Sequence, residues 1–174
     1  MEIREEIFEN IVFLDIDGVM NDIFSNEYFT KEAIDTLNDL YEKINYKIVL
    51  SSSWKNAFTL YKMQEIFKNI GIKAPLIDKT MTFFKNDPNK RNNITLDELD
   101  NLEIDKIYTR DYEINMWIKV FKPKHFVILD DFFFDDEILK EHLVQTSFFG
   151  LEKDKGNLSL RKELIPIILE KFRI

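Results

Sequence analysis

The sequence predicts an α/β fold in which a parallel sheet is covered by helices on both faces. Three short segments, residues 11–16, 46–50 and 125–130, are mostly apolar and rich in β-branched residues, as buried strands are. Segments with apolar residues at helical spacing lie between them. This alternation is typical of right-handed crossovers, which place helices on both sides of one sheet. Polar residues end all three strands, at the edge where parallel sheets bind their ligands.

The remaining elements follow from local patterns. Thr30 can cap a helix whose apolar residues recur up to Lys43. A long apolar stripe predicts one helix over 54–70, and Gly71 stands where a left-handed residue ends such a helix. Beyond it we expect a short strand within 72–81, a loop over 85–93, a helix over 111–121, a short helix near 135–141, a strand over 143–149 and a terminal helix over 159–172.

Length and composition bound the class of protein. The 174 residues are enough for one domain with a substantial core, and we expect a single domain over 1–174. Acidic residues outnumber basic ones by 32 to 24, which argues against a broad basic surface for nucleic acid but leaves a local basic groove open. The absence of cysteine excludes disulfides, a thiolate zinc site and a cysteine nucleophile. An acidic N-terminus, and no apolar run near the ~20 residues of a membrane span, predict a cytoplasmic protein without a membrane partner.

Asp15 and Asp17 follow the first strand in the stretch DIDG. Residues two apart in a strand share a side, so both carboxylates can converge while Ile16 turns into the core. Gly18 allows a sharp turn and a close approach of the backbone to a ligand. The alternative is a loop aspartate that caps a helix, but aspartate is rarely buried without a partner. We therefore expect a functional pair of carboxylates.

Asp130 and Asp131 end the third strand and bring two more carboxylates to the same edge. Like charges gathered in this way raise one another's pKa unless a cation is present. Mg²⁺ suits such a site because it takes carboxylates, waters and a substrate phosphate as ligands. Asp135 and Asp136 can support that site or supply the N-terminal charge of the next helix, and both interpretations stay open.

The stretch SSSWK follows the second strand and offers hydroxyls and backbone N–H groups at a helix start, which suits an anion. Ser51 ends the strand and is expected to face a phosphate, with Ser52 next to it. We expect Ser53 to cap the helix and Lys55 to be solvated.

Arg110 stands just before a predicted helix and can fork onto two phosphate oxygens. The alternative is a surface ion pair with Asp111 or Glu113.

Aromatic and histidine residues are expected to be structural. Trp54 and Trp117 fall on apolar helix faces and are expected in the core. For Phe132, Phe133 and Phe134, core packing is favoured over covering the site or stacking on a nucleobase. The two histidines, His125 and His142, have no partner at a ligand spacing.

The segments DIDGV, VLSSSW, RDYEINMWI, VILDD and VQTSFFGL resemble, in this order, the haloacid dehalogenase (HAD) superfamily. Within it they are most similar to the HAD domain of Swiss Army Knife RNA-repair proteins, which is related to the phosphatase half of polynucleotide kinase-phosphatases. The resemblance covers nearly the whole chain. It implies a Rossmann-like HAD fold with a minimal cap, because one helix separates the first two motifs, and at most a small flap over about 72–109.

The resemblance also implies a mechanism. Asp15 would be the nucleophile that forms an aspartyl-phosphate, and Asp17 would protonate the leaving oxygen and then activate water. Ser51 would hydrogen-bond the transferring phosphoryl group. Arg110 fits the phosphate-binding base of the third motif best, with Lys85 as the fallback.

The same resemblance implies Mg²⁺ as the cofactor. It would be held by Asp15, by the backbone carbonyl of Asp17 and by Asp130, with Asp131 close by. Gly18 and Ser52 complete the expected substrate-binding residues.

Several functions compete at this stage. The first is a Mg²⁺-dependent phosphatase of a terminal phosphate on an RNA or DNA end, working beside a repair ligase or kinase. The second is a phosphatase of nucleotides or other small phosphorylated metabolites, which the net charge of −8 favours slightly. A receiver-like signalling domain and an inactive binding module are the non-enzyme alternatives. In receivers the paired acids come on the first strand, whereas here they come last, and a kinase is excluded because the chain has no phosphate-binding loop of the G-x-x-x-x-G-K type.

Overall fold

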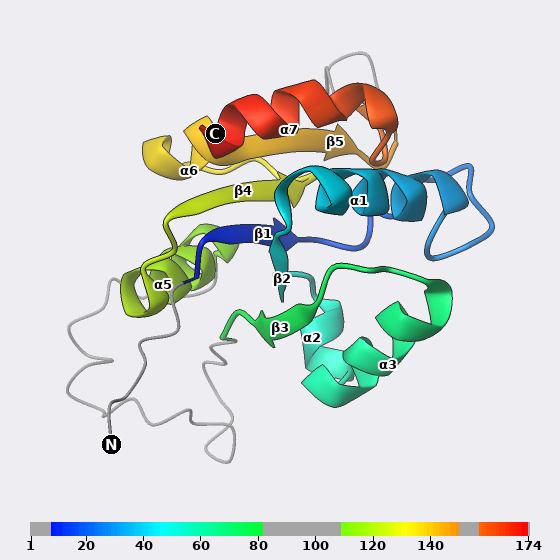
Figure 1. Cartoon of the computed structure of the whole chain (residues 1–174), viewed down its shortest axis with the longest axis horizontal. Coiled ribbons are helices and arrows are strands. Elements are labelled where there is room, and N and C mark those ends of the chain that lie inside the picture. Colours follow the sequence, from blue (N-terminus) through cyan, green and yellow to red (C-terminus); the bar gives the residue numbers. More distant parts are fainter. Residues whose placement is uncertain (1–7, 82–108, 150–156, 174) are drawn as a thin grey trace.

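The computed structural model describes residues 8–81, 109–149 and 157–173 (Figure 1). Its strands are β1 (Asn10–Leu14), β2 (Lys47–Leu50), β3 (Leu76–Lys79), β4 (His125–Asp130), β5 (Leu143–Ser147) and β6 (Asn157–Leu158). Its helices are α1 (Lys31–Ile44), α2 (Trp54–Ala57), α3 (Leu60–Ile70), α5 (Arg110–Phe121), α6 (Glu137–His142), the short 3₁₀ helix η3 (Lys162–Leu164) and α7 (Ile165–Phe172).

The sheet is parallel, and its strands lie in the order β3-β2-β1-β4-β5-β6. Figure 1 shows β3, β2, β1, β4 and β5 above one another in this order. The chain starts in the middle at β1, moves outward to β3, and resumes at β4 on the other side of β1. The predicted α/β class with a parallel sheet is therefore confirmed, and the order reverses between β1 and β4, where such sheets bind ligands.

Side chains of β1 alternate between two apolar clusters. Val12 and Leu14 belong to the cluster that α1, α3 and α7 build on one face of the sheet. Ile11 and Phe13 belong to the cluster that α5 and α6 build on the other face. Helices thus cover both faces, and the four apolar residues 11–14 of β1 are fully buried between them, as the sequence predicts.

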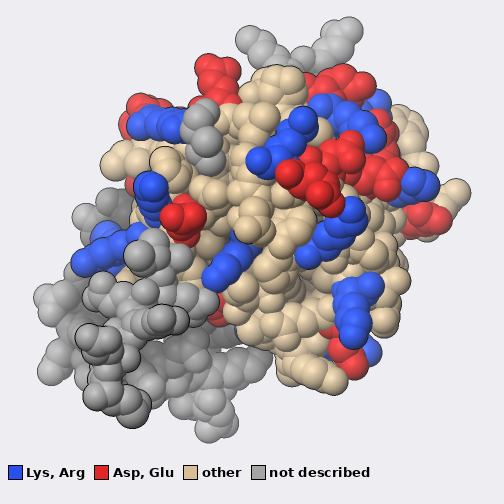
Figure 2. Space-filling view, viewed as in Figure 1, with Lys and Arg blue, Asp and Glu red and all other residues tan. Residues whose placement is uncertain are grey.

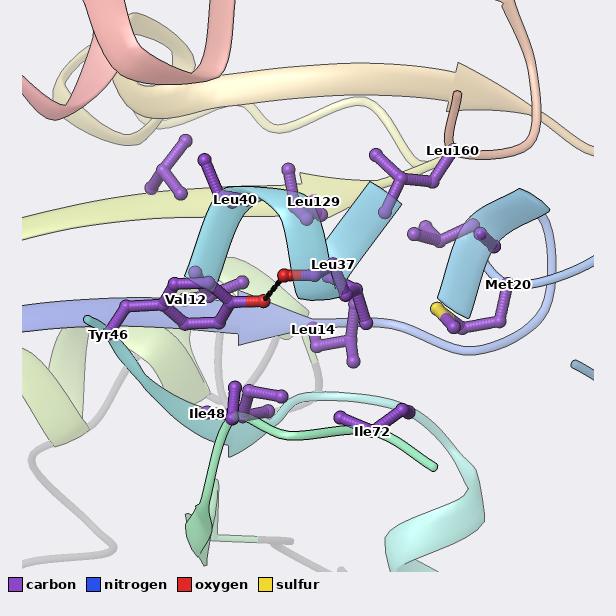
Figure 3. Packing of buried hydrophobic residues seen from close by; sticks show 14 of the residues in the cluster. Val12, Leu14, Met20, Leu37, Leu40, Tyr46, Ile48, Ile72, Leu129 and Leu160 are labelled. Carbon is purple, nitrogen blue, oxygen red and sulfur yellow. Dashed lines mark hydrogen bonds between the residues drawn. The ribbon is translucent and has the colours of Figure 1, made fainter. Parts of the chain in front are cut away.

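A buried tyrosine, Tyr46, belongs to the first of these clusters. Figure 3 shows Tyr46 among Val12, Leu40 and Ile48, with its hydroxyl donating a hydrogen bond of 2.9 Å to the carbonyl oxygen of Leu37. Burial raises the pKa of Tyr46 well above its usual value. The bond satisfies a hydroxyl that would otherwise be costly to bury.

Two predicted helix ends are confirmed, and one predicted helix is wrong. Thr30 Oγ1 accepts a hydrogen bond of 3.2 Å from the N–H of Ala33 at the start of α1, and Gly71 ends α3 with φ +88°. The expected helix over 54–70 is broken, because Phe58 is extended and Thr59 caps a new helix, α3. A threonine that bonds the backbone locally can compete with a continuous helix in this way.

The C-terminal prediction is also corrected. Residues expected to start a helix at 159 instead follow a two-residue strand, β6, with Ser159 in a left-handed conformation. The helix α7 begins at Ile165, where Pro166 stands in its first turn. Proline favours that position because it lacks the N–H that the first turn leaves unpaired.

Some predictions fall on residues that the structure does not describe. The loop over 85–93, with Lys85, lies outside the described residues. So does most of the expected flap over 72–109, whose described part contains β3. In the described ranges, no helix combines the length and apolarity needed to cross a membrane.

Candidate active site

The strand register brings three polar residues to one edge of the sheet. Leu14 of β1 is aligned with Leu50 of β2 on one side and with Leu129 of β4 on the other. Asp15, Ser51 and Asp130 each come one residue later in the chain. The N–H of Asp15 donates to the carbonyl of Leu129 at 3.0 Å, and the N–H of Ser51 donates to the carbonyl of Leu14 at 2.9 Å. The expected meeting of these strand ends is confirmed.

Three carboxylates converge at this edge. Asp15, Asp130 and Asp131 each offer an oxygen, and these atoms lie within 4.8 Å of one another. Asp15 and Asp130 are buried. Burial and the charge of Asp15 raise the pKa of Asp130 to about 7, although the charge of Arg110 opposes this shift. Burial and the charge of Asp15 also raise the pKa of Asp131 to about 6. Such a cluster attracts a cation.

Arg110 supplies a cation to this cluster. It is the first residue of α5, whose cap Thr109 accepts a hydrogen bond from the N–H of Tyr112. Arg110 Nη1 lies 2.7 Å from Asp15 Oδ2 and 2.7 Å from each carboxylate oxygen of Asp130. Burial opposes the charge of Arg110, but the two carboxylates outweigh it and raise its pKa. The alternative of a surface ion pair is wrong.

Gly18 is required at its position on two grounds. Its φ of +84° is disfavoured for residues with a side chain, and an added Cβ would lie 2.4 Å from Asp131 Oδ2. Its carbonyl accepts a hydrogen bond of 2.7 Å from Thr146 Oγ1, and its N–H donates to Asn21 Oδ1 at 3.1 Å. The turn after β1 is thereby held against the carboxylate cluster.

The carboxylate of Asp17 is not among the three that lie within 4.8 Å of one another, so the expected convergence of the Asp15 and Asp17 carboxylates is wrong. Asp17 Oδ1 accepts a hydrogen bond of 3.2 Å from Asn21 Nδ2, and Asp17 Oδ2 accepts one of 3.0 Å from Trp54 Nε1. The ring of Trp54 packs against the core as expected, but its N–H reaches the site, which the sequence interpretation missed. The available signal was the tryptophan within SSSWK, directly after a strand that ends at the site. Asn21 was also missed.

The serines after β2 differ in their environments. Ser51 Oγ is buried and has no hydrogen-bond partner. Among the residues that the structure describes, it is the only buried side-chain polar atom in this situation. Ser52 is buried too, and its Oγ accepts a long bond of 3.4 Å from the N–H of Trp54. Ser53 stands at the cap position of α2 without a capping side-chain bond, so that prediction is wrong.

Lys55 is not solvated, contrary to expectation. Its side chain is 4% exposed and forms an ion pair with Glu113 of α5. Its Nζ also donates to Thr80 Oγ1 at 2.7 Å. Burial lowers the pKa of Lys55 and raises the pKa of Glu113, and each partner's charge opposes the shift of the other. Because Glu113 lies one turn after Arg110, the pair joins the serine segment to the helix that carries the arginine.

Some of the residues after Asp131 have a structural role, and others are exposed on the surface. Asp136 caps α6, since its Oδ1 accepts bonds from the N–H groups of Ile138 and Leu139 at 2.9 and 3.0 Å. This confirms the helix-terminus interpretation for Asp136. Phe134 is buried as expected, but Phe132 and Phe133 are exposed, and the Phe132 ring lies 5.1 Å from the guanidinium carbon of Arg110.

The two lone histidines were expected to be structural, and the contacts of His142 agree. Its ring stacks on Phe126 at 4.1 Å, and its Nδ1 lies 3.0 Å from the carbonyl oxygen of that residue.

Comparison with known proteins identifies the family. Residues 11–155 match the family model described as the HAD domain in Swiss Army Knife RNA repair proteins. No significant match is found among curated proteins or solved structures. The matched segment begins within β1 and includes every residue of the carboxylate cluster, Ser51 and Arg110. The chain therefore belongs to the family of HAD domains in Swiss Army Knife RNA repair proteins.

Proposed function

We propose that this protein is a Mg²⁺-dependent phosphomonoesterase that works through an aspartyl-phosphate on Asp15. One observation carries the proposal: a cationic nitrogen of Arg110 lies 2.7 Å from carboxylate oxygens of both Asp15 and Asp130 at the strand edge that also holds Ser51. Membership in a HAD family supports the same reaction class.

The residues fit the metal that the resemblance implies. Three carboxylates within 4.8 Å provide hard oxygen ligands of the kind that Mg²⁺ takes, together with waters and phosphate oxygens. Asp15, Asp130 and Asp131 would hold the ion, and the backbone carbonyl of Asp17 stays a predicted ligand. A bound Mg²⁺ would supply charge neutralisation between the carboxylates and the phosphoryl oxygens.

In the first half-reaction an oxygen of Asp15 attacks phosphorus. Asp15 Oδ1 accepts a hydrogen bond of 2.8 Å from the N–H of Ile16, and we assign the attack to Oδ2, the oxygen that faces Arg110. The new bond joins Oδ2 to phosphorus while the bond to the leaving oxygen breaks. Asp17 gives its proton to that oxygen, and the phosphoryl group stays on Asp15.

In the second half-reaction Asp17 is a carboxylate and accepts a proton from water. That water attacks phosphorus, the bond to Asp15 Oδ2 breaks, and inorganic phosphate leaves. Trp54 and Asn21 hold the two oxygens of Asp17, so the same group stays oriented through both steps.

Phosphate binding is assigned to Ser51 and Arg110. Ser51 Oγ can donate its unused hydrogen to a phosphoryl oxygen, which would satisfy a buried polar atom. Arg110 already faces Asp15 Oδ2, so its guanidinium is close to where phosphorus would be bonded. Ser52 and Gly18 stay predicted contacts to the substrate.

We assign a terminal phosphate of an RNA or DNA end as the substrate, because the family is that of RNA repair proteins. A repair ligase or kinase is the corresponding partner. Small phosphorylated metabolites are the second candidate, and the net charge of −8 favours them slightly. Figure 2 shows acidic and basic side chains interspersed on the face in view, without a continuous basic surface among the coloured residues.

The test is phosphate release from a 3′-phosphorylated RNA oligonucleotide, with a nucleotide panel and an aryl phosphate as comparison substrates. We expect release that requires Mg²⁺ and is lost in Asp15→Asn and Asp17→Asn. It should be kept in Asp39→Asn, because Asp39 is a partly exposed acid of α1 that pairs with Lys162 outside the carboxylate cluster. Release from the nucleotides alone would select the metabolite phosphatase. Silence on every substrate would contradict the proposed chemistry.

A further inference from the structure

A cavity of about 310 Å³ opens beside the proposed acid–base residue. Asp17 lines it, together with residues of the segment 21–28 that follows β1 and with Phe148 after β5. If Asp17 protonates the leaving oxygen, the leaving group lies on this side of the site. We propose that the cavity is the leaving-group site and that it takes a nucleoside, which combines uncharged hydroxyls with a flat base. This inference rests on the proposed function.

Hydrogen bonds preform the cavity. Asn21 Nδ2 donates to the carbonyl of Tyr28 at 3.1 Å, which closes the segment 21–28 on itself. The N–H of Ile23 donates to the carbonyl of Phe148 at 2.9 Å, which ties the segment to the other wall. Ser25 Oγ donates to the carbonyl of Asp22 at 2.8 Å. Because the site is already ordered before binding, less of the binding free energy is lost to ordering its loop and side chains.

The charge of the lining selects against a second phosphate. Asp17, Asp22 and Glu27 line the cavity, and among the residues that the structure describes the lining includes no lysine or arginine. Asp22 Oδ1 already accepts a bond from the N–H of Phe24, so its main contribution is negative charge. Carboxylates repel a phosphate but accept hydrogen bonds from sugar hydroxyls and from amino groups of a base. Asn26 adds an amide that can donate and accept.

An aromatic wall suits a flat base. Tyr28 is 69% exposed, and its ring meets the ring of Trp54 edge to face with 5.4 Å between centroids. Trp54 in turn bonds Asp17, so a base stacked on Tyr28 would lie next to the proton donor. The volume is at the lower end of the roughly 300–1,000 Å³ of small-molecule sites. It matches the size of one nucleoside.

The test measures binding of adenosine and of ribose by calorimetry. Adenosine carries no phosphate, so its binding does not depend on turnover. We expect adenosine to bind more tightly than ribose, and Tyr28→Ala to weaken adenosine binding about tenfold through loss of stacking. Glu27→Gln should weaken it about threefold by removing a charged acceptor. Tyr61→Ala is the matched control, because Tyr61 is 70% exposed but lies on α3, outside the lining.

Equal binding of adenosine to the wild type and to Tyr28→Ala would overturn the inference, as would no binding at all. Phosphate release without adenosine binding would leave the phosphatase standing and discard the nucleoside site. Adenosine binding that Tyr28→Ala weakens, together with silence on all phosphorylated substrates, would support the nucleoside site and contradict only the proposed reaction.

Discussion

The indole Nε1 of Trp54 donates a hydrogen bond of 3.0 Å to Asp17 Oδ2. The two residues are 37 positions apart, and the bond connects the start of α2 with the turn after β1. The proposed acid–base residue is therefore oriented by a side chain from the segment that is proposed to bind phosphate.

Trp54→Phe should keep the ring contacts but lose this orientation. Because a hydrogen bond to a charged group contributes roughly 1.5–3 kcal/mol, we expect kcat to fall about tenfold or more, with KM nearly unchanged. Steady-state phosphate release measures both. Trp117→Phe is the control, since it also removes an indole bond, of 2.7 Å to Asp78, but away from Asp17. Equal losses of kcat in both variants would refute the orienting role.

Arg110→Met should make the metal-free protein less stable and more responsive to Mg²⁺. The substitution leaves the buried carboxylates of Asp15 and Asp130 without their cation, which costs about 3 kcal/mol of unfolding free energy. Thermal unfolding with and without Mg²⁺ should show a larger rise of Tm in the variant than in the wild type. Arg173→Met, at an exposed ion pair, serves as the control. An unchanged Mg²⁺ response would place the metal elsewhere.

Gly18→Ala and Gly71→Ala separate backbone strain from collision with the site. Both glycines have positive φ, so each variant should lose roughly 1 kcal/mol of stability. Only at Gly18 would the new Cβ meet Asp131, since nothing lies within 4 Å of a Cβ at Gly71. We expect Gly18→Ala alone to lose phosphatase activity and Mg²⁺ binding, as measured by assay and calorimetry. Full activity in Gly18→Ala would contradict the close packing of the turn.

Lys55→Met should destabilise the protein more than the double variant Lys55→Met, Glu113→Leu. The single change leaves Glu113 buried without its partner, at a cost of roughly 3 kcal/mol, whereas the double change removes both charges. Chemical denaturation measures the difference. If the pair also positions Arg110, the double variant should keep its stability but show weakened phosphate release. A double variant with wild-type activity would confine the pair to a structural role.

Asp136→Ala should lower stability by about 1 kcal/mol at pH 7, because Asp136 caps α6. Hydrogen bonds from the backbone of Leu139 lower the pKa of Asp136 below its ordinary value, so the folded state binds fewer protons there than the unfolded state. The stabilisation is complete above about pH 4 and is lost as the pH falls further. The gap in Tm between variant and wild type should therefore shrink on acidification. Asp135→Ala, at the neighbouring position, is the control.

The meeting of polar residues at the ends of the strands could be predicted because it depends on local sequence patterns. The apolar runs before Asp15, Ser51 and Asp130 mark parallel strands, and parallel strands present their carboxyl ends at one edge. Period and chain order were sufficient for this, and in the structure Asp15, Ser51 and Asp130 each follow one of three aligned leucines, Leu14, Leu50 and Leu129.

The contacts of Trp54 and Lys55 could not be predicted in this way. Their partners, Asp17 and Glu113, are 37 and 58 positions away, so no local spacing links them. Each residue type also has a common structural role, as a core ring or a solvated cation, which local reasoning favours. The break at Phe58 and the strand β6 were missed because a short irregularity leaves almost no periodic signal.

The central position of β1 has a consequence for motion. This strand is paired on both sides and buried on both faces, so its amides should exchange with solvent only when the whole sheet opens. The backbone of Asp15 shares that protection through its bond to Leu129, while Tyr28 and Glu27 lie on an exposed segment. Hydrogen exchange should therefore be slow at Asp15 and fast around Tyr28. The backbone that carries the proposed nucleophile would therefore stay closed even when the segment beside it opens to solvent.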